Sequence, residues 1–300
     1  METILITGGT GLIGRSLSSF LTKKGFNVTL LSRTKHNKPN YYFWDIEKGI
    51  IEEEAIKSAH YIIHLAGVNI AESRWSSKQK KAILTSRTLS TNLLYEKVKL
   101  LNPGLKAFIS ASGVGYYGAI TSSAVFTEND MAGKDFLSNV CVEWENGAKK
   151  FNSIGIRNVV LRTGVVFAKK GSALQKMSKP IKLGFGVVLG NGQQYIPWIH
   201  ISDLCSLYHY VLINEKLNGV FNAVSPDHIN NYELTHLISK NYKKKIWLPN
   251  VPAFVFRILL GEMSTLLTKG SAISPNKILK KGFKFRFSDI ENALQNLIKP

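Results

Sequence analysis

The chain has 300 residues, of which 44% are hydrophobic and 20% are charged, the proportions of a globular protein. This composition excludes a disordered or fibrous chain, and the length allows one large domain or two small ones. The 39 basic and 20 acidic residues give a formal net charge of +19. The lysines are scattered, with a longest run at Lys243–Lys245, so a solvated surface explains this charge better than a nucleic-acid partner does.

The two cysteines, Cys141 and Cys205, have no CxxC spacing and no histidine cluster beside them. They predict neither a metal site nor a disulfide framework. Reduced thiols of this kind favour a cytoplasmic compartment. No secretory signal is expected before Ile4, because the first strand begins almost at once.

The most apolar late segment, Val251–Leu267, is interrupted by Pro252, Arg257 and Glu262. The interruptions exclude a membrane span. The spacing of its apolar residues predicts an amphipathic helix packed on the body of the protein.

Strands and helices alternate from the first residues onward. The apolar runs predict strands at Thr3–Ile6, Asn27–Leu31, Tyr41–Trp44, Tyr61–Leu65, Lys106–Ser110, Asn158–Arg162 and Gly219–Ala223. Between them, helices are predicted at Leu12–Lys24, Ser77–Lys99 (capped by Ser76 or Ser77), Phe136–Asn152 and Ser202–Ile213. This alternation predicts an α/β fold, a doubly wound parallel sheet of Rossmann type with right-handed crossovers. The strands lack polar alternation, as expected for a sheet covered on both faces.

The junction of the first strand and the first helix reads TGGTGLIG, Thr7–Gly14. Its glycines have the spacing G-x-x-G-x-x-G, which permits a tight turn, a close approach of a pyrophosphate, and close helix packing. The helix N-terminus then faces the anion with free N–H groups. A turn with no ligand is the alternative. The motif predicts a dinucleotide site lined by Gly8, Thr10, Gly11, Leu12, Ile13 and Gly14.

The end of the second strand indicates which dinucleotide is bound. It reads LLSRT and has no carboxylate for the ribose 2′-hydroxyl of NAD. Arg33 instead suits the 2′-phosphate of NADP, with Arg15 and Lys35 nearby, unless Arg33 is only a solvated charge. Asp45, after the third strand, either caps a turn or accepts a hydrogen bond from the adenine amino group.

The glycine motif therefore assigns residues 1–165 to an NADP-binding Rossmann domain, with residues 201–224 returning to the sheet. Residues 166–200 and 225–300 are predicted to form a small, mostly helical substrate or cap region. One basic segment in it, Phe283–Phe287, has the pattern of a strand.

Several motifs resemble the extended short-chain dehydrogenase/reductase superfamily. They are the fingerprint Thr7–Gly14, HLAG at His64–Gly67, SASGVGYYG at Ser110–Gly118, LRTGVVF and PWIHISDL. The resemblance implies further cofactor contacts at Leu65, Ala66, Gly67, Ser110 and Val165.

A narrower resemblance covers nearly the whole chain. AGVNIAESRWS, DFLSNVCVEWE and the C-terminal GFKFRFSDIENAL are similar to an epimerase-like family, whose members are labelled nucleoside-diphosphate-sugar epimerase or cell-division inhibitor. These labels establish no substrate.

The sequence departs from the superfamily at its Tyr-x-x-x-Lys pair. Taking Glu145 as the glutamate that usually follows, the lysine position falls on Cys141 and the tyrosine position on Leu137. Lys149 lies about two helical turns too late to be the missing lysine. The resemblance therefore implies an atypical member with the cofactor site but without the usual pair.

The candidate catalytic residues lie in the serine motif. Ser112 aligns with the superfamily serine that polarises a carbonyl, although a structural hydroxyl is the alternative. Tyr117, or a bound water, is the candidate for proton transfer. Tyr116 is a candidate for substrate contact, and both tyrosines alternatively only pack against the nicotinamide or a substrate.

Further substrate contacts are predicted in two loops. Asn69, Arg74 and Trp75 follow the fourth strand and suit an anionic or aromatic substrate, or form a structural lid. Trp198 and His200 come from PWIHISDL, where His200 is either an acid–base group or a buried structural residue. Asp203 is expected to cap the following helix or to sit in its first turn.

Together these features favour an NADP(H)-dependent oxidoreductase that acts on a small carbonyl or hydroxyl compound. The alternatives are a non-catalytic NADP(H)-binding sensor or scaffold, and a sugar-nucleotide epimerase or dehydratase. The expected partner is an unidentified small-molecule substrate, with no membrane span and no nucleic acid, and the chain is expected to be a monomer or a homodimer.

Overall fold

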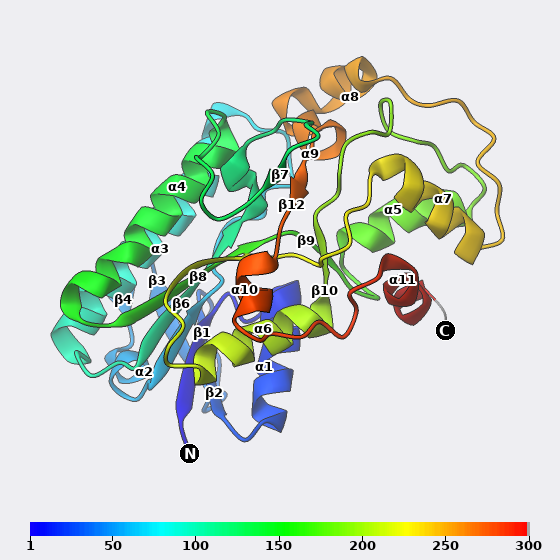
Figure 1. Cartoon of the computed structure of the whole chain (residues 1–300). Coiled ribbons are helices and arrows are strands. Elements are labelled where there is room, and N and C mark those ends of the chain that lie inside the picture. The colour runs from blue at the N-terminus through cyan, green and yellow to red at the C-terminus, as the bar shows by residue number, and fades with distance from the viewer. Residues whose placement is uncertain (299–300) are drawn as a thin grey trace.

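The computed structural model describes residues 1–298 and is centred on an eight-stranded sheet (Figure 1). The strand order is β11-β8-β6-β5-β1-β2-β3-β4, and every pair is parallel except β3 with β4. The strands are β1 (Thr3–Thr7), β2 (Asn27–Ser32), β3 (Tyr41–Asp45), β4 (Ile50–Ile51), β5 (Tyr61–His64), β6 (Ala107–Gly113), β8 (Arg157–Thr163) and β11 (Gly219–Ala223). This order winds outward from β1 in both directions, which confirms the predicted Rossmann-type doubly wound sheet.

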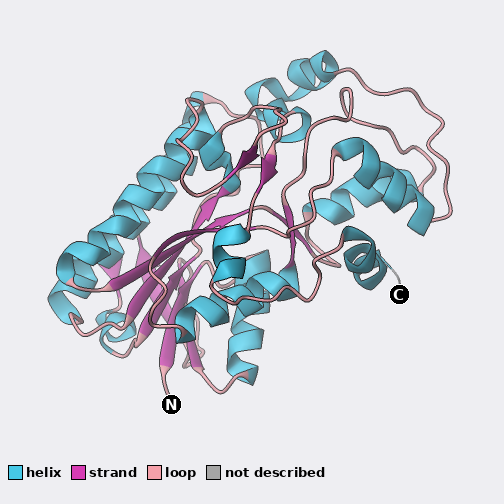
Figure 2. Cartoon of the chain, viewed as in Figure 1, coloured by secondary structure: helices cyan, strands magenta, loops and turns pink. Residues whose placement is uncertain are grey.

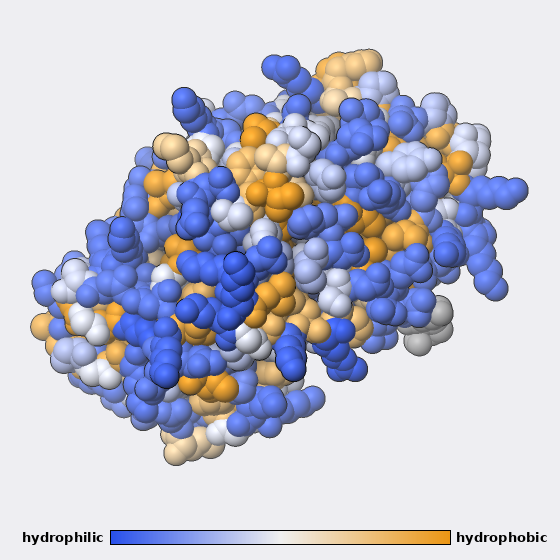
Figure 3. Space-filling model, viewed as in Figure 1, coloured by the Kyte–Doolittle hydropathy of each residue, from blue (hydrophilic) through white to orange (hydrophobic). Residues whose placement is uncertain are grey.

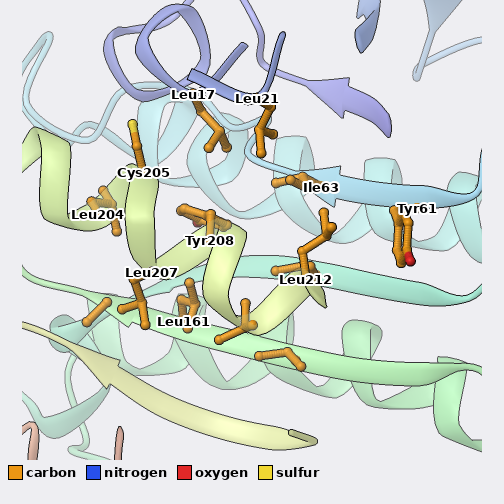
Figure 4. Close-up of a cluster of buried hydrophobic side chains, with 14 of the residues drawn as sticks. Leu17, Leu21, Tyr61, Ile63, Leu161, Leu204, Cys205, Leu207, Tyr208 and Leu212 are labelled. Atoms are coloured by element: carbon orange, nitrogen blue, oxygen red, sulfur yellow. The ribbon is translucent and has the colours of Figure 1, made fainter. Parts of the chain in front are cut away.

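Helices cover both faces of the sheet (Figure 2). On one face, α1 (Leu12–Lys23) packs beside α6 (Ile201–Ile213), and Figure 4 shows their leucines, among them Leu17, Leu21 and Leu207, meeting over the strands. On the other face lie α2 (Glu53–Lys57), α3 (Ser77–Leu101) and α4 (Phe136–Lys149), which share a second core with the strands. Strands buried on both sides explain why the sequence shows continuous apolar runs there.

The remaining elements are short. They are η1 (Val114–Tyr117), β7 (Val125–Phe126), η2 (Lys150–Ile154), β9 (Val165–Phe167), α5 (Ala173–Lys182), β10 (Trp198–His200), α7 (Asn231–Asn241), α8 (Ala253–Leu260), η3 (Gly261–Ser264), α9 (Thr265–Thr268), β12 (Ala272–Ile273), α10 (Asn276–Lys280) and α11 (Ile290–Ile298). α5, α7 and α11 enclose a third core with β9 and β10. The eight-stranded sheet itself uses only residues 3–163 and 219–223.

The prediction of one packed amphipathic helix over Val251–Leu267 is wrong. Gly261 has a φ of +61°, and it separates α8 from η3 and α9. None of the eight residues of α8 is buried, and Ile258 is 70% exposed. Apolar atoms accordingly gather at the top of the molecule, over α8 (Figure 3).

The prediction of a strand at Phe283–Phe287 is also wrong, because backbone N–H groups of this segment bond to Asp203, which lies in the first turn of α6 as one of its two predicted roles requires. The Asp203 carboxylate lies buried in the first turn of α6 and accepts hydrogen bonds from Arg286 N (2.9 Å) and Phe287 N (2.8 Å). These N–H groups therefore bond to a side chain instead of a neighbouring strand. His200, not Asp203, caps α6, by accepting from Ser202 N.

We expect Asp203→Ala to lower the free energy of unfolding by about 2–4 kcal/mol, because each unsatisfied buried donor costs about 1–3 kcal/mol. Urea unfolding measures the change. Asp130→Ala is the matched control, since its exposed carboxylate also accepts two hydrogen bonds, from Thr127, but in a surface turn, and little change is expected. Equal losses in the two variants would contradict the assignment.

Candidate functional site

The glycine turn has the geometry of an anion-binding helix start. Gly8 has a φ of +69°, and a Cβ there would lie 2.9 Å from the Leu65 carbonyl oxygen. A Cβ on Gly14 would lie 2.3 Å from Gly8 O, so these two glycines let the turn, the helix and β5 touch. Gly11 is the N-cap of α1; no side chain caps the helix, and its first turn has no acidic residue. The N–H groups of Leu12 and the two residues after it therefore remain available to a phosphate.

Thr7 joins this turn to the HLAG segment. Its Oγ1 accepts hydrogen bonds from Leu65 N and Ala66 N, both at 3.1 Å, and lies 2.8 Å from His64 Nδ1. Gly67 follows directly, so the residues expected to contact the cofactor on β1 and β5 lie at one edge of the sheet. A dinucleotide crosses the sheet at such an edge in folds of this type.

His64, the first residue of HLAG, is fully buried behind this edge. Its Nε2 lies 3.2 Å from Ser90 Oγ and 3.1 Å from Thr91 Oγ1. Both hydroxyls already donate to α3 carbonyls, which assigns the proton to Nε2 and leaves Nδ1 to accept from Thr7. Burial lowers the pKa of His64 to about 3, so the ring is neutral.

The residues expected to recognise the 2′-phosphate lie beyond β2. Arg33, Arg15 and Lys35 are exposed, and within residues 1–298 none of the three forms an ion pair. Asp45 caps a turn, as one of its two predicted roles requires, by accepting from Glu47 N and Lys48 N at 3.1 Å.

The positions of the missing Tyr–Lys pair lie against the serine motif. Leu137 packs on Gly115, and the Cys141 thiol donates to Gly113 O at 3.5 Å. Burial, with Glu145 nearby, raises the pKa of Cys141 to about 11. A neutral thiol and an alkyl group thus occupy the place where the superfamily has an ammonium and a phenol.

The candidate catalytic residues belong to a buried chain of hydrogen bonds. Ser112 Oγ donates to Glu145 Oε1 at 2.7 Å, and Arg162 donates to both Glu145 oxygens at 2.8 Å. Arg162 Nη1 also donates to Tyr117 Oη at 3.0 Å, and Tyr117 Oη donates to Asn222 Oδ1 at 2.7 Å. The protons of Ser112 and Tyr117 are therefore both directed at other protein groups.

Tyr116 differs from Tyr117 in the surroundings of its hydroxyl. Burial raises the pKa of Tyr117 to about 12 despite the nearby Arg162. The Tyr116 ring lies only 3.2 Å from Arg162 Cζ, and its hydroxyl has no hydrogen-bond partner among the described residues. Sequence reasoning missed Arg162 and Asn222, although an arginine within an apolar strand is itself a signal of a buried ion pair.

The loop after β5 connects the sheet to the C-terminal elements. Trp75 donates to Ile70 O at 2.8 Å and packs edge-on against Phe136. Asn69 Oδ1 accepts from Ala71 N at 2.9 Å. The exposed Arg74 guanidinium lies against Gly261 of η3. In the same region Lys80 of α3 forms an ion pair with Glu262.

The structure places Trp198 and His200 in the C-terminal core. Trp198 is fully buried and donates to Asp227 O at 3.1 Å. His200 stacks on Phe287, and its ring nitrogens contact Ser202 Oγ at 2.7 Å and Asn296 Oδ1 at 3.2 Å. Burial lowers the pKa of His200. These contacts match the structural alternative, and neither residue contacts the serine motif or the glycine turn.

Other features of the described residues do not add a second site. No group of histidine, cysteine, aspartate or glutamate side chains among them could hold a metal ion, and no helix is long and apolar enough to cross a membrane. A hollow of about 520 Å³ includes no predicted site residue and is lined by Asp227, His228, Ile229, Tyr232, Glu233, His236 and Leu237.

This fold and turn define a dinucleotide-binding protein of the short-chain dehydrogenase type, and the comparisons give the family. Residues 4–223 match the NAD dependent epimerase/dehydratase family, and residues 251–297 match a domain of unknown function (DUF1731). The chain belongs to the NAD dependent epimerase/dehydratase family.

Relatives match over the full length. An epimerase family protein of Staphylococcus aureus is 34% identical over 307 residues, covering 100% of both chains. The crystal structure of the human epimerase family protein SDR39U1 (isoform 2) with NADPH superposes with a TM-score of 0.89 at 31% identity, covering 98% of each chain. That of a nucleoside-diphosphate sugar epimerase from Corynebacterium glutamicum gives 0.81 at 29% identity, covering 99% of this chain and 58% of that one.

The neutral His64 makes the sheet edge sensitive to acid. Below its ordinary pKa of 6.5 the unfolded chain binds a proton that the folded protein does not, so stability falls as the pH drops from about 6.5 towards 3. We expect about 2 kcal/mol of stability to be lost through this group between pH 6.5 and 5.

Urea unfolding at several pH values measures this loss. His64→Asn should flatten the dependence on pH whatever its stability at pH 7, whereas His36→Asn, in an exposed loop, should leave it unchanged. An unaltered pH dependence in His64→Asn would show that the ring is protonated in the folded protein.

Proposed function

We propose that the chain is an NADP(H)-dependent oxidoreductase that interconverts a small carbonyl compound and its alcohol. The observation that carries the proposal is the uncapped N-terminus of α1 beside Gly8 and Gly11, with the cationic Arg33 where NAD enzymes have a carboxylate. The human relative at 31% identity, whose structure contains NADPH, supports the choice of dinucleotide.

The cofactor contacts in this proposal follow the edge described above. The turn Gly8–Gly14 holds the pyrophosphate through backbone N–H groups, and Arg33 binds the 2′-phosphate. Leu65, Ala66, Gly67, Ser110 and Val165 line the rest of the cofactor. When bound, the cofactor supplies or accepts the hydride at the substrate carbon.

Within the serine motif, Tyr116 is the residue that we assign to the substrate oxygen. Because Ser112 donates its proton to Glu145, its Oγ has lone pairs but no proton to offer, and its part is to position the loop. Tyr117 is held by Asn222, so we assign the proton that balances the hydride to the free Tyr116 hydroxyl or to a water bound there. Asn69, Arg74 and Trp75 form the substrate side, with Arg74 suited to an anionic group.

A second function is also favoured, because the hydroxyl protons of Ser112 and Tyr117 are donated to other protein groups. Leu137 and Cys141 in place of the usual Tyr–Lys pair favour it as well. In it the chain is an NADP(H)-binding sensor or scaffold without turnover. The family name makes epimerisation of a sugar nucleotide a third possibility, which needs the same proton transfer.

We propose that the protein is cytoplasmic, since Cys141 and Cys205 are both free and buried.

Cofactor choice is tested by calorimetric titration with NADPH and NADH. Arg33→Ala should weaken NADPH binding by about 10- to 100-fold, the value of a charge-assisted bidentate contact, and leave NADH binding unchanged. Lys38→Ala, a cation of the same loop, is the control and should alter neither. Equal losses for both dinucleotides would assign Arg33 to the fold instead of the phosphate.

Turnover is tested by mixing the NADPH-loaded protein with a panel of aldehydes and ketones and following absorbance of the reduced nicotinamide. Tyr116→Phe should slow the single-turnover oxidation by about 10²–10⁴-fold, as removal of a general acid does, with cofactor binding intact. Tyr117→Phe should slow it less. No oxidation with any compound would favour the sensor.

A further inference from the structure

Arg87 of α3 is a desolvated cation without an anion. Burial lowers the pKa of Arg87 to about 10, and no carboxylate among residues 1–298 lies within ion-pair distance of it. Only Nη1 is engaged, donating to Val68 O at 3.1 Å and Ile83 O at 2.9 Å. An uncompensated buried charge is costly, so proteins usually pair it with a carboxylate or with convergent acceptors.

Two arginines of the strand β8 show such pairing. Arg162 holds the Glu145 carboxylate through two nitrogens, and Arg157 donates from both terminal nitrogens to carbonyls in the last turn of α6 and in the loop after it. In Arg87 the Nε and Nη2 groups have no hydrogen-bond partner among the described residues. Neither nitrogen is among the fully enclosed side-chain atoms that lack a hydrogen-bond partner.

The position of this guanidinium coincides with the cofactor edge. A Cβ on Gly67 would lie 2.8 Å from Arg87 Cζ and 3.0 Å from its Nη2, so the guanidinium lies directly against the HLAG backbone. The guanidinium also lies over the Trp144 ring, with Cζ 4.9 Å from its centroid. Cys141, at the position of the missing lysine, is close enough for the Arg87 charge to act on its thiol.

The sheet order indicates which half of a dinucleotide meets Arg87. β1 carries the phosphate turn, with β2 and Arg33 on one side and β5 and β6 on the other. A dinucleotide whose 2′-phosphate contacts Arg33 and whose pyrophosphate lies at the turn extends its second nucleoside over β5 and β6. Gly67 lies just after the end of β5, and Cys141 contacts Gly113 at the end of β6.

We propose that Arg87 is a cofactor-binding residue that supplies, from α3, the fixed positive charge that the helix α4 lacks at Cys141. Its free N–H groups face the nicotinamide ribose, and its charge disfavours the cationic oxidised nicotinamide relative to the neutral reduced one. The inference rests on the proposed NADP(H) function and adds a preference for the reduced form.

The test compares binding of three ligands by calorimetry: NADPH, NADP⁺ and adenosine 2′,5′-bisphosphate, which lacks the nicotinamide half. Arg87→Met should weaken NADPH binding about tenfold, which corresponds to about 1.4 kcal/mol. The same substitution should lower the dissociation constant of NADP⁺ divided by that of NADPH. It should leave the binding of the bisphosphate unaffected. Arg87→Lys should retain most of the ratio, because the charge remains.

Ser86→Ala is the matched control, since Ser86 Oγ accepts from Val68 N at 3.0 Å and anchors the same loop without a charge. A ratio that is unchanged in Arg87→Met, or that falls equally in Ser86→Ala, would overturn the assignment and show a structural role. A wild-type protein that binds neither NADPH nor the bisphosphate would instead refute the proposed cofactor.

Discussion

The contact between the ends of β1 and β5 is the constraint on which the site depends. Thr7 Oγ1 accepts from two successive backbone N–H groups, of Leu65 and Ala66, and donates to the neutral His64 ring. Only a glycine at position 8 leaves room for the Leu65 carbonyl at this distance. The same contact thus keeps the phosphate turn open towards the ligand and fixes the backbone that borders it, so the geometry of one strand end cannot change without the other.

A second constraint explains why the serine motif does not have its usual chemistry. In the superfamily, a phenol and an ammonium on the helix after β6 handle the proton, whereas here α4 contributes Glu145 to a buried ion pair with Arg162. That pair draws in the Ser112 proton and places Arg162 against Tyr117. A buried ion pair repays its desolvation only when its remaining hydrogen bonds are satisfied, and Ser112 and Tyr117 satisfy them.

Features set by local sequence could be predicted, and features set by long-range partners could not. The strands of the sheet and the turn at Gly8 follow from apolar runs and glycine spacing, which act within a few residues. The hydrogen bond from Arg286 N to Asp203 joins residues 83 positions apart, and the sequence near either residue does not predict it. The apolar residues of α8 predicted burial because the pattern specifies an apolar face but not whether any element covers it. Arg162 and Tyr117, 45 positions apart, meet only through the pairing of β6 with β8.

Three arginines, two on β8 and one on α3, connect these observations to function. Within a net charge of +19, most cations are solvated and carry no structural information. Arg157 and Arg162 are exceptions whose acceptors lie within the protein, so the fold accounts for their burial. For Arg87, on α3, the fold supplies a tryptophan face and two carbonyls but no counter-charge among the described residues, and its Nε and Nη2 have no hydrogen-bond partner there. A loss on one helix and an unpaired cation on its neighbour, at the same edge of the sheet, are most simply explained as one rearrangement of a single binding site.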